Sequence, residues 1–283
     1  MRLIIQQFEQ LWEWHYFGEC ASHIASFFLL LRLNTSRIIC FMAVELAHTP
    51  HPHQNLIGKR IDLLDKGWIE LQDIMGDDLA IVNAARVSFL GESKGGDKDK
   101  KLLFYLLNHR HTSPFEQVEF KFRVRAPVVT WWQWARHRVW NFNAQSGRYV
   151  AFEENDFYTP TVWRKQSPSN KQASLGELTT EDGSLLTQDL VEHYARGYAL
   201  YEKALKMGVA REQARVFLPG FSVYYTWVAK VDAHNLMHFL GLRMAEDAQY
   251  EIRVYAQAIY EHFFKPALPW TAEAFEKFIL RRD

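Results

Sequence analysis

Residues 126–149 read APVVTWWQWARHRVWNFNAQSGRY, a tryptophan-rich apolar run that leads directly into a basic segment. The basic segment holds side chains suited to anions, namely Arg136, His137, Arg138, Ser146 and Arg148. Guanidinium groups bind phosphate oxygens two at a time, and serine hydroxyls and backbone N–H groups fill the remaining lone pairs. The stretch therefore predicts an anion site directly after a buried element. The alternative is a solvated basic loop of the same composition.

The apolar run has the features of a helix. Pro127 suits a first helical turn, and we expect the helix to continue to about Arg138. Gln133 and Arg136 would then share a face, with His137 one turn beyond Gln133. In that arrangement the side-chain amide of Gln133 can hydrogen-bond to an amide group of a ligand whose phosphate is bound by the basic segment.

The residues after this helix favour a turn. Asn141, Asn143 and Gly147 are residues that turns commonly use. A turn there would bring Ser146 and Arg148 back toward the end of the helix. A hydrolase role for Ser146 is disfavoured, because its surroundings lack the first glycine of a nucleophile elbow.

Several motifs of the chain occur in the order found in one enzyme family. The Arg-His-Arg at 136–138, followed after seven residues by Ser-Gly-Arg-Tyr, resembles the signature of flavin-dependent thymidylate synthases. The further matching segments are residues 84–89 (AARVSF), 111–116 (HTSPFE), 214–219 (ARVFLP), 242–243 (LR) and 248–252 (AQYEI). The similarity extends from about Lys59 to the C-terminus.

This resemblance implies a fold and a reaction. The fold is a single α+β domain with a mixed or antiparallel sheet flanked by helices, in a homotetramer whose sites form between subunits. The reaction is the reductive methylation of dUMP to dTMP. FAD is the implied cofactor, methylenetetrahydrofolate the carbon donor and NADPH the reductant, with no metal and no nucleic-acid or membrane partner.

The resemblance also implies residue roles. Arg243 would be the catalytic residue, since a guanidinium beside the uracil stabilises negative charge that develops on the ring; the alternative is an arginine that binds carbonyls at a helix C-terminus. The residues implied to bind dUMP are Gln133, Trp134, Arg136, Ala144, Gln145, Ser146, Gly147, Arg148, Arg215 and Arg243, with Arg136 and Arg148 at the phosphate. Those implied to contact FAD are Ser88, Ser113, Glu116, Arg136, His137, Arg138, Asn143, Asp232, His234 and His238.

Five positions depart from the family pattern. Asp232, His234 and His238 stand where the family usually has Asn, Arg and Asn; Ala144 replaces a common Glu, and Asp247 a frequent His. If these changes only weaken flavin binding, excess FAD restores activity. The alternative is a divergent homologue that binds flavin or nucleotide with lost or altered catalysis.

Composition limits the classes of function. A chain of 283 residues with 48% hydrophobic residues can bury a sizeable core, and its formal net charge is zero. General nucleic-acid and membrane-surface binders usually carry a basic excess, so a small ligand is favoured. An RNA or single-strand binding module that stacks bases on Trp131, Trp132, Trp134 and Tyr149 is a third, less favoured hypothesis.

Cysteine usage restricts the chemistry further. Cys20 and Cys40 are the two cysteines of the chain, so no disulfide framework is expected. One route to methylation of uracil at C5 uses attack by a cysteine thiolate, and no cysteine follows Cys40. A redox cofactor is expected instead, in agreement with the resemblance.

The chain before the region of resemblance is expected to be distinct. We assign residues 1–57 to an N-terminal extension or linker and residues 58–283 to the enzyme domain. The apolar run at 24–31 is shorter than the roughly 20 residues that span a bilayer, and a cytoplasmic location is expected. Met42 is a possible start, with residues 1–41 dispensable or untranslated. The histidines of 47–54 suit a flexible linker, with metal binding as the alternative.

The remaining pattern predicts the elements that carry these residues. His234 and His238 lie four apart on one helix, a spacing that also suits a metal, but no third ligand is evident. The expected strands are within 60–72, 116–126 and 222–231. The expected helices of the first part are 77–89, 101–108 and one over 186–205 that ends before Gly208. Three further helices are expected: one that Asp232 begins, one from Asp247 toward Pro266, and one capped by Thr271. Residues 91–101 are expected to form a mobile loop, and 164–184 a polar insertion or lid.

Overall fold

The computed structural model describes residues 51–280. These residues belong to one unit of the chain, which begins at His51. The expectations for Cys20, Cys40, the apolar run at 24–31 and a start at Met42 concern residues outside the described range.

The central element is a five-stranded antiparallel sheet. Its strands follow the order β1-β2-β3-β7-β4. Their bounds are β1 Arg60–Leu63, β2 Gly67–Met75, β3 Glu119–Pro127, β4 Asn141–Ala144 and β7 Tyr224–Asp232. In β3, Phe120, Phe122 and Val124 are buried while Lys121 and Arg123 are exposed, as the alternation in the sequence predicts. The α+β class with an antiparallel sheet is confirmed.

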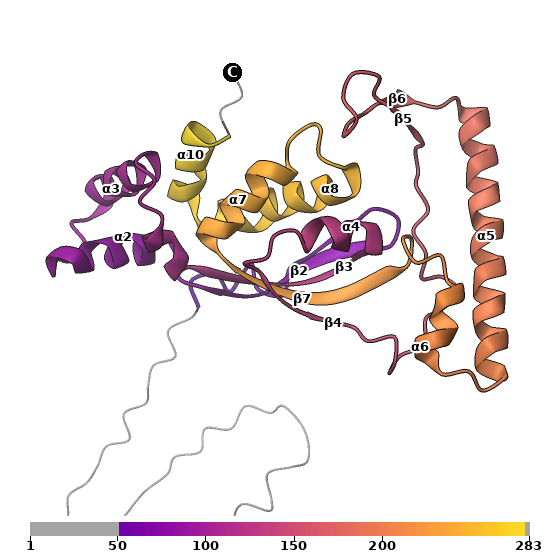
Figure 1. Cartoon of the computed structure of the whole chain (residues 1–283). Helices are drawn as coiled ribbons and strands as arrows, with labels where there is room; N and C mark the ends of the chain where they lie inside the picture. The colour runs from indigo at the N-terminus through magenta and orange to yellow at the C-terminus, as the bar shows by residue number, and fades with distance from the viewer. Residues whose placement is uncertain (1–50, 281–283) are drawn as a thin grey trace, which may run out of the picture. The chain divides into compact units, whose positions relative to one another are not determined.

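Helices that cover one face of this sheet form the core. Figure 1 shows α4, α7 and α8 on the same side of β2, β3 and β7. The bounds are α4 Val128–Trp134, α7 Ala233–Arg243, α8 Tyr250–Ile259, the π-helix η4 Tyr260–Phe264, α9 Lys265–Ala267 and α10 Pro269–Phe278.

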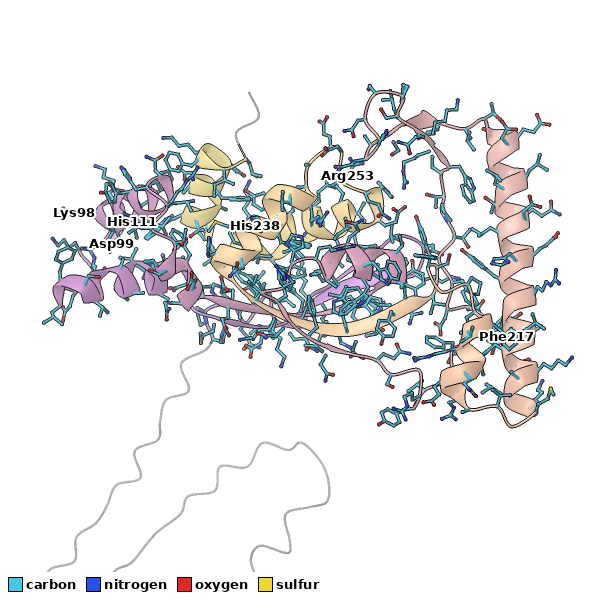
Figure 2. All side chains as sticks on the ribbon, in the orientation of Figure 1. Lys98, Asp99, His111, Phe217, His238 and Arg253 are labelled. Atoms are coloured by element: carbon cyan, nitrogen blue, oxygen red, sulfur yellow. The ribbon has the colours of Figure 1, made fainter. Side chains whose placement is uncertain are left out.

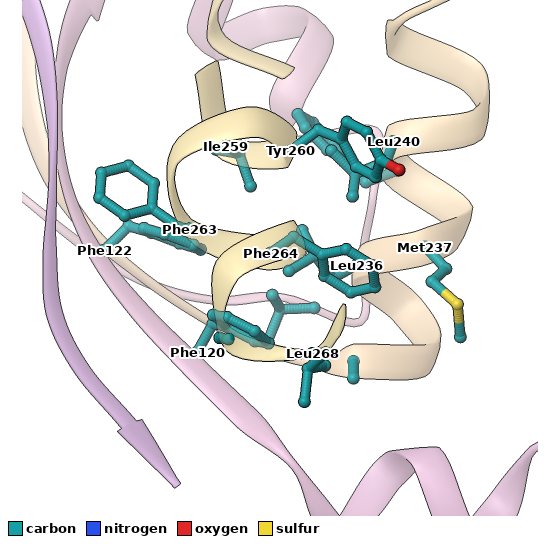
Figure 3. Packing of buried hydrophobic residues seen from close by; sticks show 14 of the residues in the cluster. Phe120, Phe122, Leu236, Met237, Leu240, Ile259, Tyr260, Phe263, Phe264 and Leu268 are labelled. Atoms are coloured by element: carbon teal, nitrogen blue, oxygen red, sulfur yellow. The ribbon is translucent and has the colours of Figure 1, made fainter. Parts of the chain in front are cut away.

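Aromatic rings join β3 to the C-terminal helices. The ring of Phe122 lies 5.7 Å from that of Phe263, and Phe120 lies 6.0 Å from Phe264 (Figure 3). All four rings are fully buried. The sheet face that carries α4 and α7 is therefore a rigid platform, and those two helices carry the site described below.

A second, smaller cluster lies under the long helix α5 (Thr180–Lys206). It contains Phe157, whose ring stacks on that of Tyr194 at 4.9 Å, and Tyr201. The helix ends before Gly208, which has φ +85°, as the sequence predicts. The other elements are α2 Asp78–Arg86, η1 Val87–Phe89, α3 Gly96–Asn108, η2 Ser113–Gln117, β5 Arg164–Gln166, β6 Ser174–Glu177, α6 Arg211–Ala214 and η3 Arg215–Phe217.

The segment after α4 differs from the expectation. The helix ends at Trp134, short of Arg138, because the chain turns there and the N–H of His137 donates to the carbonyl of Trp134 at 2.9 Å. Asn141 and Asn143 then lie in β4, paired with β7, so the predicted turn at these residues is wrong. Pairing with an available sheet edge outweighs the local turn preference of asparagine.

Three predicted helix starts also differ. Helix α3 begins at Gly96, because Asp97 and Asp99 in its first turn complement the helix dipole. Helix α8 begins after Gln249, so Asp247 does not cap it. Thr271 lies inside α10, where its hydroxyl donates to Asp78 at 2.6 Å.

Residues 51–57, which we assigned to the extension, pack onto the domain. The ring of His51 donates to the carbonyl of Ile74 at 2.8 Å, and that of His53 to the carbonyl of Gly76 at 3.0 Å. Leu56 is part of the main core. Both histidine rings are thus engaged with backbone carbonyls at the end of β2. Over residues 51–280, no helix combines the length and apolarity needed to cross a membrane.

We predict that Phe120→Ala lowers the free energy of unfolding by about 3–5 kcal/mol, because it leaves a cavity between β3 and η4. Phe89→Ala is the matched control, since Phe89 is 89% exposed; it should change stability by less than about 0.5 kcal/mol. Urea unfolding followed by circular dichroism measures both. Equal losses for the two variants would contradict the packing described here.

Candidate active site

The guanidinium of Arg243 is the centre of the first group of site residues. Arg243 is the last residue of α7, and its Nε donates to Nε2 of His137 at 3.0 Å. Its Nη1 donates to Oε1 of Gln133 at 3.1 Å, and its Nη2 to the carbonyl of Gln133 at 3.3 Å. Because α4 and α7 pack on the same face of the sheet, residues 110 apart in the chain meet here. Gln133, His137 and Arg243, which the resemblance had implied, are thus in contact.

All the partners of Arg243 in these bonds are neutral. Burial, followed by the charges of Arg243 and His238, lowers the pKa of His137 from 6.5 to about 4. The imidazole is therefore uncharged at neutral pH, and its Nε2 has the lone pair needed to accept from Arg243. Within residues 51–280 no carboxylate forms an ion pair with Arg243. Its half-buried positive charge is free to act on a ligand.

The partly exposed face of α7 continues this group. The ring of His238 lies 5.9 Å from that of His137, and Figure 2 shows His238 on α7. One turn earlier, Nδ1 of His234 lies 3.6 Å from Oε1 of Glu116 on η2. Four residues implied to contact flavin therefore lie on α7 or in contact with its histidines, namely Glu116, His137, His234 and His238. Among the described residues, no set of three or more His, Cys, Asp or Glu side chains is placed to hold a metal ion.

Asp232 is engaged as a helix cap. Its Oδ1 accepts from the backbone N–H of Asn235 at 2.9 Å, and its Oδ2 accepts from the Asn235 amide at 2.7 Å. Capping of α7 by Asp232 is confirmed. Asp232, which stands where the family usually has Asn, thus has both carboxylate oxygens bonded to Asn235.

The second group surrounds the Ser-Gly-Arg loop and lies near α6. The N–H of Arg148 donates to Oγ of Ser146 at 3.3 Å, and its side chain pairs with Glu212 at 3.0 Å. A Cβ on Gly147 would lie 3.5 Å from Nη1 of Arg215 and 2.8 Å from the ring of Phe152, so the loop requires glycine. Three residues that the resemblance implies for dUMP binding, Ser146, Arg148 and Arg215, are therefore neighbours.

The two groups are separate within one chain. The predicted return of Ser146 and Arg148 toward Arg136 is wrong, because β4 carries the chain along β7, where the N–H of Gln145 donates to Thr226. No cavity described within residues 51–280 is lined by both groups. In Figure 1, α6 lies near one end of α5, away from α7.

The other implied site residues differ in accessibility. The side chain of Trp134 is fully buried and packs against Trp140, Trp227 and Phe239, so its ring offers no surface to a ligand. Ala144 packs against the main core. The exposed residues of the set are Ser88, Ser113, Glu116, Arg136, Arg138, Asn143, Arg148, Arg215 and His238.

A cavity of about 790 Å³ opens beside Arg243. Gln133, Arg243 and the segment after α7, which includes Asp247, contribute to its lining. Residues between 160 and 174, among them Trp163 and Arg164, also line the cavity. The sequence indicates only a polar insertion or lid at 164–184, without a link to Arg243. The signal in the sequence for a ligand site here is the pair Trp163 and Arg164 at the start of that polar segment.

A cavity with a half-buried cation and an arginine–serine loop on an antiparallel sheet define a class of protein that binds small anionic ligands. Residues 70–270 match the family model described as thymidylate synthase complementing protein. The chain belongs to the family of flavin-dependent thymidylate synthases, which confirms the resemblance seen in the motifs.

Relatives and solved structures agree with this membership. A flavin-dependent thymidylate synthase of Thermus thermophilus is 48% identical over 220 residues, which is 78% of this chain and 79% of the relative. That of Thermosipho africanus is 44% identical over 222 residues, 78% of this chain and 96% of the relative. A crystal structure of the UMP/dUMP methylase PolB from Streptomyces cacaoi bound with 5-Br dUMP is 34% identical, with a TM-score of 0.70; the match covers 78% of this chain and 99% of that one.

We predict that His137 makes stability depend on pH. Its folded pKa of about 4 lies below the ordinary 6.5, so between these values the unfolded chain binds a proton that the folded chain does not. Stability is therefore lost as the pH falls from about 6.5 to about 4. His137→Gln keeps an acceptor for Arg243 without a titrating ring, and should make this loss smaller. Urea unfolding across that range measures it, and an unchanged slope in the variant would contradict the assignment.

Proposed function

We propose that the protein methylates dUMP at uracil C5 to form dTMP. The carbon comes from methylenetetrahydrofolate, and NADPH supplies the two electrons that reduce it to a methyl group, while the C5 hydrogen leaves as a proton. Family membership supports the reaction class, and the PolB structure, which is named a UMP/dUMP methylase, supports the substrate.

The uncompensated charge of Arg243 is the observation that carries this proposal. For C5 of uracil to act as a nucleophile, electron density must build up on the ring and its carbonyl oxygens. A guanidinium held by neutral Gln133 and His137 stabilises that density without neutralisation by a carboxylate. No cysteine follows Cys40, so activation by charge replaces covalent attack.

The exposed side chains near α7 suit a flavin nucleotide. Arg136 and Arg138 are exposed and form no ion pair within residues 51–280, so they can bind the pyrophosphate. The carboxylate of Glu116 can accept from ribose hydroxyls, and the rings of His234 and His238 offer donors along α7. Bound FAD supplies the hydride chemistry that no side chain provides.

The separation of the two groups supports a site shared between two copies. Residues of the Ser-Gly-Arg loop of one chain would complete the Arg243 cavity of another chain, in a homotetramer. The surface around the loop is apolar: Tyr149 and Val216 are each 80% exposed, and Phe221 is 60% exposed. Figure 2 shows Phe217 beside α6 on the same part of the domain. Burial of these side chains against a second copy would favour such an assembly.

The departures from the family pattern suggest a limit on flavin affinity. Ala144 supplies no acceptor, and the carboxylate oxygens of Asp232 are bound to Asn235. We therefore expect the purified protein to lose FAD readily and to turn over dUMP when FAD is in excess. A protein that binds FAD and dUMP but shows no turnover would support the alternative, a homologue with lost catalysis.

We predict that Arg243→Ala lowers the rate of C5 hydrogen release from dUMP by about 10²–10³-fold, as loss of one electrostatic stabiliser does in other enzymes. The assay follows tritium released from C5 with FAD in excess. Arg60→Ala, on the exposed strand β1, is the control and should retain the full rate. Undiminished release from the Arg243 variant would overturn its role.

We predict that Arg243→Ala and Arg148→Ala restore activity to each other when the two variant chains are mixed after unfolding. A shared site takes Arg243 from one chain and Arg148 from another, so random pairing leaves about a quarter of the sites intact. The measurement is dTMP formation by the refolded mixture against each variant refolded alone. If both residues act within one chain, the mixture stays as inactive as its parts.

A further inference from the structure

The β5–β6 hairpin is attached to two different helices by neighbouring side chains. Nε1 of Trp163 donates to Oγ1 of Thr187 in α5 at 2.9 Å, while Nη2 of Arg164 pairs with Oε1 of Glu251 in α8 at 2.7 Å. Successive residues of extended chain point to opposite sides. Figure 1 shows the hairpin between α8 and α5, which agrees with these two attachments.

The attachment to α8 is an ion pair whose carboxylate is buried and has a partner for each oxygen. Glu251 is 5% exposed, and its Oε1 also accepts from the hydroxyl of Tyr158 at 3.1 Å. Its Oε2 accepts from Gln249 at 2.9 Å. The guanidinium carbon of Arg164 lies 4.7 Å from the ring centroid of Tyr250. Arg164 is thus fixed by charge on one side and by an aromatic face on another.

The hydrogen bonds from Arg164 and Gln249 keep the carboxyl group of Glu251 ionised. Burial alone would raise its pKa, but the hydrogen bonds from Arg164 and Gln249 and the charge of Arg164 outweigh burial and hold the pKa below its usual value. The pair therefore persists at neutral pH. Removal of either partner leaves the other charge in a poorly solvated place.

The hairpin forms a wall of the cavity that contains Arg243. Arg164, Gln166 and Ser174 line this cavity together with Gln133 and Arg243. The hairpin is braced internally, because Nε2 of Gln166 donates to the carbonyl of Ala173 at 3.0 Å. A hairpin with such an internal bond moves as a unit, so its attachments to α5 and α8 fix its position in the cavity lining.

We propose that Arg164 and Glu251 are positioning residues that hold this hairpin as the wall of the dUMP site. The inference rests on the proposed function. The pair sets the width of the cavity and hence the affinity for the nucleotide, while Arg243 retains its neutral partners and its effect on the ring. Arg164 acts through the wall and not as a direct ligand of the phosphate.

The test is a double-mutant cycle on the full chain loaded with FAD, with dUMP binding measured by calorimetry. Arg164→Ala and Glu251→Gln should each raise the Kd for dUMP about tenfold, and the double variant should be no weaker than the weaker single variant. The rate of C5 hydrogen release at saturating dUMP should stay within about twofold. Lys265→Ala breaks the Lys265–Glu276 pair, at 3.0 Å and away from the cavity, and is the control with unchanged Kd.

A second measurement covers variants that lose stability. Hydrogen exchange without ligand should become faster at the hairpin amides of Ser167 and Ala173 in Arg164→Ala, and stay unchanged in β3 and β7.

The proposed function and the positioning role fail in different ways. If the natural protein does not bind dUMP, the proposed function fails and this inference with it. If dUMP binds and Glu251→Gln binds it as tightly, or the two losses add, the positioning role is overturned while the proposed function stands.

Discussion

The contact of Arg243 with Gln133 and His137 is the interaction on which the candidate site depends. A guanidinium normally has a carboxylate partner when it is partly buried. Here a neutral imidazole, an amide and a backbone carbonyl accept from three of its five N–H donors, so the charge is oriented but not cancelled. Burial, followed by the charges of Arg243 and His238, lowers the pKa of His137, and the neutral imidazole then accepts from Arg243.

The sheet and its helices maintain that geometry. Helix α4 and helix α7 lie on the same face of the sheet, and Phe239 of α7 packs against both Trp134 of α4 and His137. These rings leave little freedom for the end of either helix. The β5–β6 hairpin and the Ser-Gly-Arg loop attach to other parts of the domain, so under the proposed function three separately supported surfaces would contact one nucleotide. That requirement accounts for the use of a second copy in the proposed assembly.

Much of the fold could be predicted from periodicity and from helix caps. The alternation around Phe120 and Phe122 identified β3, and Asp232 and Gly208 identified helix ends, because these signals are local. The errors arose where a distant element decided the outcome. Asn141 and Asn143 favour a turn by themselves, but the free edge of β7 made them a strand. Thr271 favours a cap, but Asp78 holds its hydroxyl inside a helix.

The family, the residue types suited to anions and the absence of a cysteine after Cys40 can all be known from residue types and their order. Which of those residues lie in contact depends on how the chain folds. The tertiary structure placed Arg243 beside His137, placed Arg148 with Arg215 elsewhere, and put Arg164 in the lining of the same cavity as Arg243. The physical reason is that contacts between residues a hundred positions apart depend on how helices and strands pack, and packing depends on the shape of the whole core.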